Sequence, residues 1–374
     1  MTSPAAGTAA APAPMTFEER TTASGHRIGF ATLDRPRQLN ALNLQMCQMM
    51  LDQFRAWQSD EGIVAVVLQG AGDKGFCAGG DVADVIRRVR EGGPQRFVYG
   101  DAFFDVEYQL DYLIHTFGKP FIAYSHGVCM GGGVGLFAGA SHRVLAERTK
   151  LAMPEIHIGL FPDVGGGFFL NRVPAGIGRI LALTGLIINE ADALFAGLAD
   201  AFVPLEMRDA LWADLLAQPF TGQARRDREI VSMRMLAAAR RAASGLPESN
   251  LRSYFDALRV IAAMPTVTAL RDALLAAAQE DPWFETPAAS LANGSPTAAF
   301  VTFEYLERCR HLSLREVLTL DLVLATNFQR RPDFVEGVRA LLIDKDKSPK
   351  WSPASFDDVD RADVLAHFSL DGLR

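Results

Sequence analysis

The sequence has few cysteines, no long apolar run and no excess of basic residues. Its four cysteines, Cys47, Cys77, Cys129 and Cys309, are far apart in the chain of 374 residues and form no Cys-x-x-Cys motif, which argues against a disulfide framework and against a zinc site. No apolar stretch reaches the roughly 18 residues of a membrane-spanning helix. The net charge of -7 lacks the basic balance that is typical of nucleic-acid-binding proteins. We therefore expect a protein of the reducing cytoplasm that binds neither membranes nor nucleic acids.

The bulk composition is that of a folded protein. Hydrophobic residues make up 49% of the chain and charged residues 22%, whereas a disordered chain has low hydrophobicity and high net charge. The length suggests two domains, or one large domain with an extension. Only residues 1–14, which are rich in alanine and proline, indicate a disordered tail, since they lack both the apolar core of a secretory signal and the arginines of a mitochondrial leader.

Short apolar runs alternate with helical patterns after this tail. Apolar and β-branched residues predict buried strands at residues 27–33, 63–68 and 120–124. Apolar residues at helical spacing predict a helix over residues 43–57, with Asn43 as its N-cap. Repeated strand–helix alternation is typical of an α/β fold, in which helices cover a largely parallel sheet.

The second half of the chain shows few strand signals. Ser295, directly before a proline, predicts the start of one helix, and Ser313 fits a capping box at the start of another. We therefore expect two parts after the tail: a catalytic α/β core over residues 15–218 and a helical C-terminal lobe over residues 219–374.

Two glycine-rich segments follow predicted strands and precede predicted helices. They are GFCAGGD at residues 75–81 and MGGGVG at residues 130–135. Unpaired backbone N–H groups at the start of a helix favour negative charge, so two such segments can form an oxyanion hole. The alternative is that the glycines only permit tight turns and close packing. Neither segment completes a dinucleotide-binding motif or a P-loop, because Leu136 and Asp81 stand where those motifs need glycine and lysine.

Acidic residues in apolar surroundings are the candidates for acid–base chemistry. Glu155 and Asp163 lie eight positions apart among methionine, isoleucine, leucine and phenylalanine residues. Such surroundings raise the pKa of a carboxyl group and suit it to proton transfer, and the spacing lets both side chains line one pocket. The alternative is that each of them caps a helix. Glu107 lies in a predicted helix, where a solvent-exposed face is the alternative to a functional role.

The segments GFCAGGD and HGVCMGGGVGL resemble the two oxyanion-hole loops of the crotonase, or enoyl-CoA hydratase/isomerase, superfamily. The resemblance implies a crotonase-like α/β fold, which is a spiral of ββα units. It also implies that the backbone N–H groups of Gly80 and Gly132 bind the thioester oxygen of an acyl-CoA, and that the neighbouring Gly79 and Gly131 line the substrate site.

Longer segments resemble one branch of this superfamily, the 3-hydroxyisobutyryl-CoA hydrolases. The resemblance implies an enzyme that hydrolyses 3-hydroxyisobutyryl-CoA, or a close 3-hydroxyacyl-CoA, in valine breakdown. It also implies that Glu155 and Asp163 are the catalytic residues and that Glu107 binds substrate. The segments are FFDVEYQLDYLI (103–114), AMPEIHIGLFPDVGGGFFLNRVP (152–174) and FVEGVRALLIDKDKSPKWSP (334–353).

One difference from other members of the superfamily separates two chemistries. The resemblance implies that hydratases carry one glutamate late in the glycine-rich helix, where this chain has Gly135, and another at the position of Glu155. A carboxylate stands instead at Asp163, where hydratases have a small residue. Hydrolysis is therefore favoured, with an enoyl-CoA hydratase or isomerase as the first alternative and an inactive acyl-CoA-binding protein as the second.

The remaining expectations concern ligands and assembly. The segment LDRPRQLNALN (33–43) resembles the CoA-binding side of the superfamily, so Arg35 and Arg37 are candidates for contacts with the CoA phosphates. No cluster of histidines or cysteines suggests a metal site, and the only cofactor expected is CoA, as part of the acyl-CoA substrate. Crotonases commonly form trimers or hexamers, and a homo-oligomer is left open for this chain.

Overall fold

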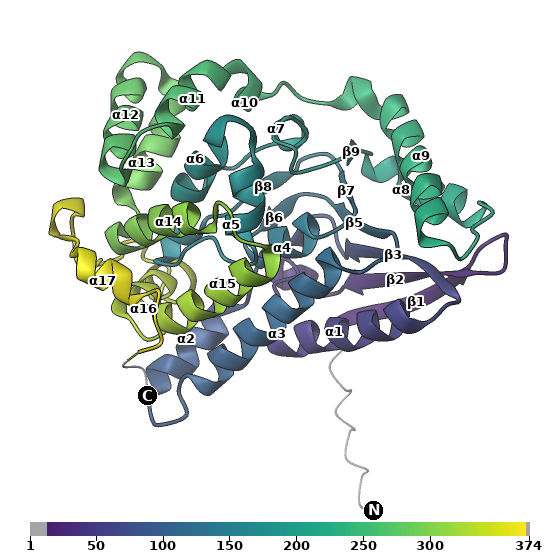
Figure 1. Cartoon of the computed structure of the whole chain (residues 1–374), viewed down its shortest axis with the longest axis horizontal. Coiled ribbons are helices and arrows are strands. Elements are labelled where there is room, and N and C mark those ends of the chain that lie inside the picture. The colour runs from purple at the N-terminus through teal and green to yellow at the C-terminus, as the bar shows by residue number, and fades with distance from the viewer. Residues whose placement is uncertain (1–12, 372–374) are drawn as a thin grey trace, which may run out of the picture.

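The computed structural model describes residues 13–371, so residues 1–12 of the predicted tail lie outside the described part. The larger of its two sheets has the strand order β1-β2-β3-β5-β7-β9, and every neighbouring pair except β1–β2 runs parallel (Figure 1). The strands are β1 (Met15–Thr21), β2 (Arg27–Leu33), β3 (Ile63–Gly70), β5 (Phe121–Ser125), β7 (His142–Leu145) and β9 (Ala201–Phe202).

The strands predicted from apolar runs are confirmed at β2, β3 and β5. In β3, β-branched residues are buried on both faces, as the central strands of a covered parallel sheet require. The edge strand β1 was not predicted, because its sequence MTFEERT is mostly polar and exposed. It pairs with β2 in antiparallel register along its whole length.

Three short strands form a second, parallel sheet in the order β4-β6-β8. They are β4 (Gly75–Cys77), β6 (Val128–Met130) and β8 (Lys150–Ala152). Each follows a strand of the larger sheet, and the first two precede the helices α2 (Val82–Glu91) and α4 (Gly132–Ala138). The glycine-rich loops therefore follow β4 and β6 instead of starting directly after β3 and β5. This repetition is the predicted spiral of ββα units.

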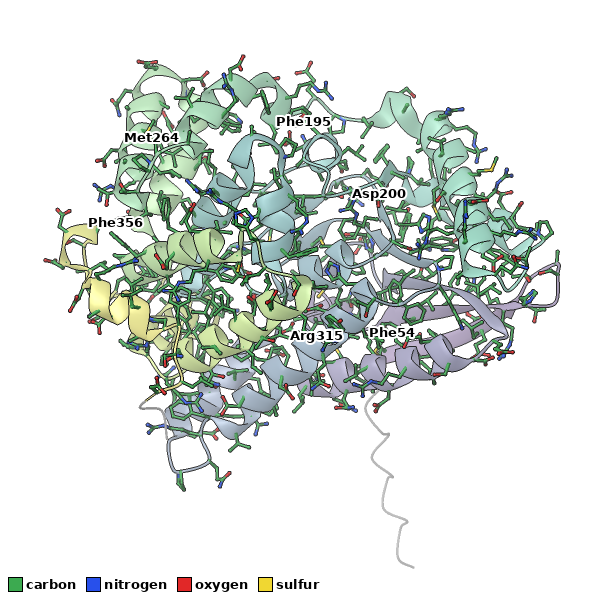
Figure 2. All side chains as sticks on the ribbon, in the orientation of Figure 1. Phe54, Phe195, Asp200, Met264, Arg315 and Phe356 are labelled. Carbon is green, nitrogen blue, oxygen red and sulfur yellow. The ribbon has the colours of Figure 1, made fainter. Side chains whose placement is uncertain are left out.

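Helices cover both faces of the larger sheet (Figure 1). Alternate strand residues separate the two layers: Val66 joins the core beneath α1 (Leu44–Ser59) and α3 (Val98–His115), while Val67 joins the core beneath α8 (Leu205–Leu216) and α9 (Ala224–Ala242). Helix α1 begins as predicted, because the Asn43 side chain accepts a hydrogen bond of 2.9 Å from the backbone N–H of Met46. Its Phe54, which is labelled in Figure 2, packs edge-on against Phe121 of β5.

The rest of the described chain after β9 is helical, as predicted. Ser295 and Ser313 cap their helices, and Ser313 does so in a capping box with Glu316. The shorter helices before β9 are α5 (Gly166–Phe169), α6 (Ile177–Thr184) and α7 (Glu190–Phe195). The later helices are α10 (Asn250–Ser253), α11 (Phe255–Ala262), α12 (Val267–Glu280), α13 (Glu285–Asn293), α14 (Pro296–Cys309), α15 (Leu314–Phe328), α16 (Pro332–Val338) and α17 (Arg361–Ala366).

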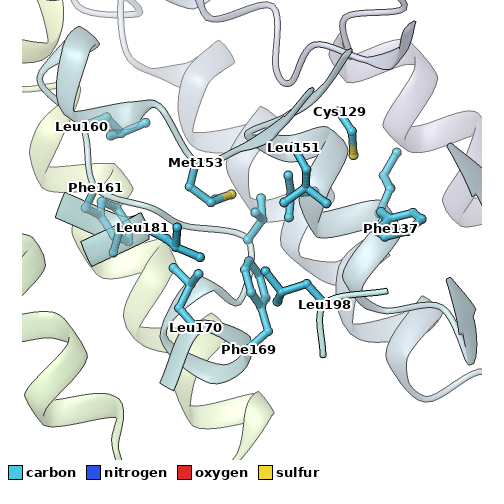
Figure 3. Packing of buried hydrophobic residues seen from close by; sticks show 14 of the residues in the cluster. Cys129, Phe137, Leu151, Met153, Leu160, Phe161, Phe169, Leu170, Leu181 and Leu198 are labelled. Atoms are coloured by element: carbon cyan, nitrogen blue, oxygen red, sulfur yellow. The ribbon is translucent and has the colours of Figure 1, made fainter. Parts of the chain in front are cut away.

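One hydrophobic core connects the two predicted parts, and Figure 3 shows a portion of it around Met153, Phe161 and Leu181. Phe161 stacks on Phe328 of α15, with ring centroids 5.5 Å apart, and packs edge-on against Tyr305 of α14 at 5.1 Å. The division into residues 15–218 and 219–374 stays a prediction. Helix α9 lies beyond that boundary in sequence but packs on the sheet of the α/β core.

Candidate active site

A cavity of about 290 Å³ lies where the two glycine-rich loops meet α3 and the segment after β8. All three predicted acids, Glu107, Glu155 and Asp163, line it. Among the described residues, no lysine, arginine or histidine is part of its wall. The other side chains that line the cavity are apolar, apart from small residues of the loops: Val82, Phe103, Phe104, Met130, Pro154, Ile158, Leu160, Leu341 and Leu342.

The N–H groups of Gly80 and Gly132 converge at this cavity. Neither donates a hydrogen bond to another group within residues 13–371. A Cβ placed on Gly132 would lie 3.4 Å from the nitrogen of Gly80, and a Cβ placed on Gly79 would lie 3.4 Å from the nitrogen of Gly132. Gly79 and Gly131 have φ angles of +97° and +51°, which favour glycine. Both N–H groups could therefore donate to one oxygen in the cavity, and their role as an oxyanion hole stays a prediction.

Glu107 lies against this pair of donors. Its side chain is buried on α3, and a Cβ on Gly132 would collide with its Oε1 atom. No group within the described residues donates a hydrogen bond to that oxygen. Burial, followed by the charge of Asp163, holds the pKa of Glu107 well above its usual range. The alternative of a solvent-exposed helix face is therefore wrong.

Glu155 begins a short 3-10 helix, η2 (Glu155–Ile158), and points its carboxyl group into the cavity. A Cβ on Gly131 would lie 3.0 Å from its Oε1 atom, so this oxygen is beside the oxyanion loop. The side chain is only 4% exposed. Burial and then the charge of Asp163 raise the pKa of Glu155 well above its usual range. Its side chain makes no capping hydrogen bond.

Asp163 lies in the loop between η2 and α5 and accepts a hydrogen bond of 2.6 Å from the hydroxyl of Tyr108. Burial raises the pKa of Asp163 to about 6, against the opposing effect of the Tyr108 hydrogen bond. The N-cap of α5 is Gly165, with no side-chain capping bond. The capping alternative is therefore wrong for both acids, and the prediction that they share one pocket is confirmed.

Residues of the helical lobe hold the Asp163 loop from behind. Asp321 of α15 accepts a hydrogen bond of 2.8 Å from the N–H of Gly165 and another from the hydroxyl of Tyr305. The Tyr305 oxygen in turn accepts from the N–H of Gly167 at 2.8 Å. Sequence reasoning missed this pair, because Asp321 lies 156 positions from the loop that it contacts. Tyr108 was also missed, although it directly follows Glu107 in a segment that was singled out.

The C-terminal run of residues 334–353 packs directly on the segment that carries Glu155. A Cβ on Gly337 would collide with the backbone of Ile158, and a Cβ on Gly159 would collide with the backbone of Asp333. Beyond this close contact, a π-helical turn, η7 (Arg339–Ile343), brings Leu341 and Leu342 to the cavity, where each is 38% exposed. The run therefore forms one wall of the site.

The two arginines proposed to contact CoA differ in their surroundings. Arg35 donates to the carbonyl of Ala41 at 2.6 Å and to the carboxylate of Asp81 at 3.1 Å, so it ties the segment before α1 to the first glycine-rich loop. Arg37 is exposed and forms no ion pair with another described residue. Arg35 thus has a structural role, and contacts of either residue with phosphate stay a prediction.

A larger cleft of about 490 Å³ lies between α1, α3 and α15, on the side of α3 that carries Tyr112. There Arg315 of α15, which is labelled in Figure 2, donates a hydrogen bond of 2.7 Å to the Tyr112 hydroxyl. This cleft contains no glycine-rich loop. Within residues 13–371, no group of three or more histidine, cysteine, aspartate or glutamate residues has the geometry to hold a metal ion, and no helix is long and apolar enough to cross a membrane.

Comparison with known proteins defines the class to which this fold and this site belong. A family model described as enoyl-CoA hydratase/isomerase matches residues 28–368. Two solved structures share the fold at high similarity. A carnitinyl-CoA dehydratase from Mycobacterium thermoresistibile has a TM-score of 0.82 and 33% identity over 94% of this chain and 96% of that chain. An enoyl-CoA hydratase from Rhodobacter sphaeroides has a TM-score of 0.80 and 34% identity over 94% and 97%. The chain therefore belongs to the enoyl-CoA hydratase/isomerase family, as its loops indicated.

Within this family, curated relatives carry the name of the predicted branch. The 3-hydroxyisobutyryl-CoA hydrolases of Danio rerio and Homo sapiens, both named mitochondrial, are each 37% identical, over 92% and 91% of this chain and 87% and 86% of their own lengths. The 3-hydroxyisobutyryl-CoA hydrolase 1 of Arabidopsis thaliana is 34% identical over 91% of this chain and 89% of its own. The resemblance to this branch is confirmed. The mitochondrial names give no support to a cytoplasmic location.

Proposed function

We propose that this protein hydrolyses the thioester of 3-hydroxyisobutyryl-CoA, or of a close 3-hydroxyacyl-CoA, and releases CoA and the free acid. The observation that carries the proposal is the pair of buried carboxyl groups, Glu155 and Asp163, in one cavity with the free N–H groups of Gly80 and Gly132. The names of the curated relatives support the choice of substrate. The proposed reaction belongs to valine breakdown.

The first step is activation of the thioester carbonyl. The carbonyl oxygen lies between the N–H groups of Gly80 and Gly132. These two fixed donors stabilise the negative charge that develops on that oxygen. Loss of one donor from such a site typically lowers the rate by about 10²–10³-fold. The apolar wall excludes water, which strengthens these electrostatic interactions.

Glu155 then attacks the thioester carbon. Because burial keeps its carboxyl group protonated, the proton moves to Asp163 as the carbon–oxygen bond forms. The carbon–sulfur bond breaks, the CoA thiolate takes the proton from Asp163, and a mixed anhydride with Glu155 remains. Asp163 then takes a proton from water, the hydroxide bonds to the acyl carbon of the anhydride, and the bond from that carbon to the Glu155 oxygen breaks. The proton returns from Asp163 to the Glu155 carboxylate, which restores both groups and releases the free acid. The position of the Glu155 Oε1 atom beside the oxyanion loop supports direct attack, and attack by a water that Glu155 activates is the alternative.

Glu107 is proposed to select the acyl group. Its buried Oε1 atom has no partner among the described residues, and a substrate hydroxyl at the 3-position supplies one. A site built to hydrogen-bond a hydroxyl rejects analogues that lack it, because its own buried polar groups are then left unpaired. The proposal therefore includes a preference for 3-hydroxyacyl over simple acyl thioesters.

The second candidate is hydration or isomerisation of an enoyl-CoA, which the titles of the solved relatives favour. A thiol-release assay over a panel of acyl-CoA thioesters separates the two, with loss of the enoyl absorbance of crotonyl-CoA followed in parallel. Hydrolysis predicts free thiol from 3-hydroxyisobutyryl-CoA and no rapid hydration. Rapid hydration without free thiol would contradict the proposal.

The variant Glu155→Gln tests the site itself. We expect at least about a 10³-fold loss of kcat, since the nucleophile is removed while the shape of the cavity is kept. Glu91→Gln, at the exposed end of α2, is the control and should match the wild type. Equal thiol release by Glu155→Gln and the wild type would rule out the role of this residue.

Three finer expectations belong to the same proposal. Arg37 is proposed to contact a phosphate of CoA, since it is exposed and unpaired among the described residues. No metal or cofactor other than the CoA of the substrate is proposed, because the thioester is already activated. A homo-oligomer and a cytoplasmic location are kept as expectations, which light scattering and cell fractionation test.

A further inference from the structure

Five carboxyl groups are buried close together in or directly behind the cavity. Asp321 does not line the cavity and accepts hydrogen bonds from Tyr305 and Gly165, and of the other four only one has a side-chain hydrogen-bond donor. These four belong to Glu107, Asp111, Glu155 and Asp163. Within residues 13–371, the hydroxyl of Tyr108 is the one side-chain donor to any of these four groups, at 2.6 Å from the Oδ2 atom of Asp163. Oxygens of the other three carboxyl groups have no partner.

We propose that Tyr108 is a positioning residue that selects Asp163 as the ionised member of this carboxyl group cluster, and so makes it the base of the reaction. This inference rests on the proposed function, since it assigns a role within the hydrolysis. Tyr108 belongs neither to the glycine-rich loops nor to the pair of acids predicted from the sequence. Tyr108 reaches Asp163 from a different element, α3, across 55 positions of sequence.

The geometry fixes the Tyr108 hydroxyl. The ring is 4% exposed and packs against Phe104, one turn earlier on α3, with centroids 6.0 Å apart. A buried phenol in a packed helix has little freedom to turn away from its partner. Because Oδ2 of Asp163 is engaged, Oδ1 is the oxygen left to receive a proton from Glu155 or from water.

Electrostatics explain why one donor decides which acid ionises. The groups that face Asp163 from the elements around it are acids or phenols, and no basic side chain lines the cavity among the described residues. Buried carboxylates this close cannot all carry charge, and a hydrogen bond to the charged form favours one of them. The groups are Glu107, Tyr108 and Asp111 of α3, Glu155 of η2, and Asp321 of α15.

The direction of each pKa agrees with this geometry. Burial lifts the pKa values of Glu107, Asp111, Glu155 and Asp321 well above their usual range, in Asp321 against its two hydrogen bonds behind the cavity. The pKa of Asp163 reaches only about 6, since the Tyr108 hydrogen bond opposes burial. These directions favour a protonated Glu155 next to an ionised Asp163, which is the pair of states that the attack by Glu155 requires.

The variant Tyr108→Phe tests the inference through the pH dependence of kcat. A hydrogen bond to a charged group is worth enough to move a pKa by about one to two units. We expect the acidic limb of the kcat profile to move up by that amount. At about pH 7, kcat should fall roughly twofold to tenfold and recover at about pH 9, with KM unchanged. A loss that is equal at every pH would overturn the proposal.

Tyr112→Phe is the matched control, because Tyr112 lies one turn further along α3 and its hydroxyl contacts Arg315 instead of an acid of the cavity. Its pH profile should coincide with that of the wild type. Melting temperatures of both variants equal to that of the wild type would show that neither variant has lost the fold. A shift of the acidic limb in both variants would contradict a specific role for Tyr108.

A second measurement is independent of activity. The protein is labelled with carbon-13 at aspartate side-chain carboxyl groups, and the Asp163 resonance is assigned from its loss in Asp163→Asn. Its titration midpoint should rise by about one to two units in Tyr108→Phe. An unchanged midpoint would overturn the inference. A wild type that releases no thiol while this midpoint still shifts would overturn the proposed function and leave the Tyr108–Asp163 interaction established.

Discussion

Gly135 of α4 lies so close to Val164 that a Cβ on the glycine would be 2.6 Å from the Cβ of the valine. Val164 directly follows Asp163 and has a φ of +51°, so the loop that carries Asp163 occupies the space beside the glycine-rich helix. The resemblance to hydratases places a glutamate at position 135. A glutamate at position 135 would therefore collide with the loop that carries Asp163 as it is packed here.

The first prediction concerns this packing. Gly135→Glu should lower the free energy of unfolding by about 1–3 kcal/mol, because overpacking displaces well-packed neighbours, and should produce no hydration of crotonyl-CoA. Urea unfolding and the enoyl absorbance measure the two effects. Gly135→Ala is the control for size alone and should show part of the loss. A stable Gly135→Glu variant that hydrates crotonyl-CoA would contradict the coupling between the two positions.

The second prediction concerns Asp111, which is fully buried and has no hydrogen-bond partner for either oxygen within the described residues. Burial raises its pKa in the folded state, so the folded state holds a proton that the unfolded state loses above about pH 4. The free energy of unfolding therefore falls as the pH rises, by at most about 1.4 kcal/mol per unit for this group.

Asp111→Asn should remove that contribution to the slope. Urea unfolding is measured at several pH values from about 5 to 8. The free energy of unfolding of the variant should rise relative to that of the wild type as the pH rises, by at most about 3 kcal/mol over two pH units. Asp105→Asn, an exposed position on the same helix, should keep the wild-type slope. Parallel curves for Asp111→Asn and the wild type would show that Asp111 is already ionised in the folded protein.

Local sequence signals were sufficient for the strands, the helix caps and the glycine-rich loops. The caps at Asn43, Ser295 and Ser313 depend on residues at most three positions away. The strand β3 is recognised by a continuous apolar run, because both faces of a covered sheet are buried. The strand β1 could not be predicted in this way, because it forms only by pairing with β2 and its own residues are mostly polar.

The candidate site was predictable where one segment carries both the residue and its surroundings. Glu155 and Asp163 share a short apolar stretch, so their burial and their raised pKa values follow from local composition. Tyr108 and Asp321 could not be found in this way. Each reaches the Asp163 loop from a distant helix, and no sequence spacing records a contact that only the packing of α3 and α15 creates.

The third prediction concerns the support that the helical lobe gives to the catalytic loop. Asp321→Ala leaves the N–H of Gly165 and the hydroxyl of Tyr305 without their acceptor. Because unsatisfied buried donors cost about 1–3 kcal/mol each, the free energy of unfolding should fall by roughly 2–6 kcal/mol. We expect kcat to fall as well, since the position of Asp163 depends on this loop. Thr319→Ala, exposed on the same helix, should change neither quantity. An Asp321→Ala variant with wild-type stability and kcat would contradict the supporting role.

The last prediction concerns Leu341 and Leu342, which are large apolar residues kept 38% exposed at the cavity. A ligand that covers an exposed leucine is bound more tightly, because apolar surface is removed from water. Covering about half of a leucine side chain contributes about 1 kcal/mol to binding. Each leucine-to-alanine substitution should therefore raise KM for acyl-CoA thioesters by roughly fivefold. It should leave kcat unchanged, because no group that transfers protons or forms bonds is altered. Leu365→Ala, at a position on α17 that is 39% exposed and does not line the cavity, is the matched control. An unchanged KM in the double variant of Leu341 and Leu342 would mean that the C-terminal run supports the segment of Glu155 without touching substrate.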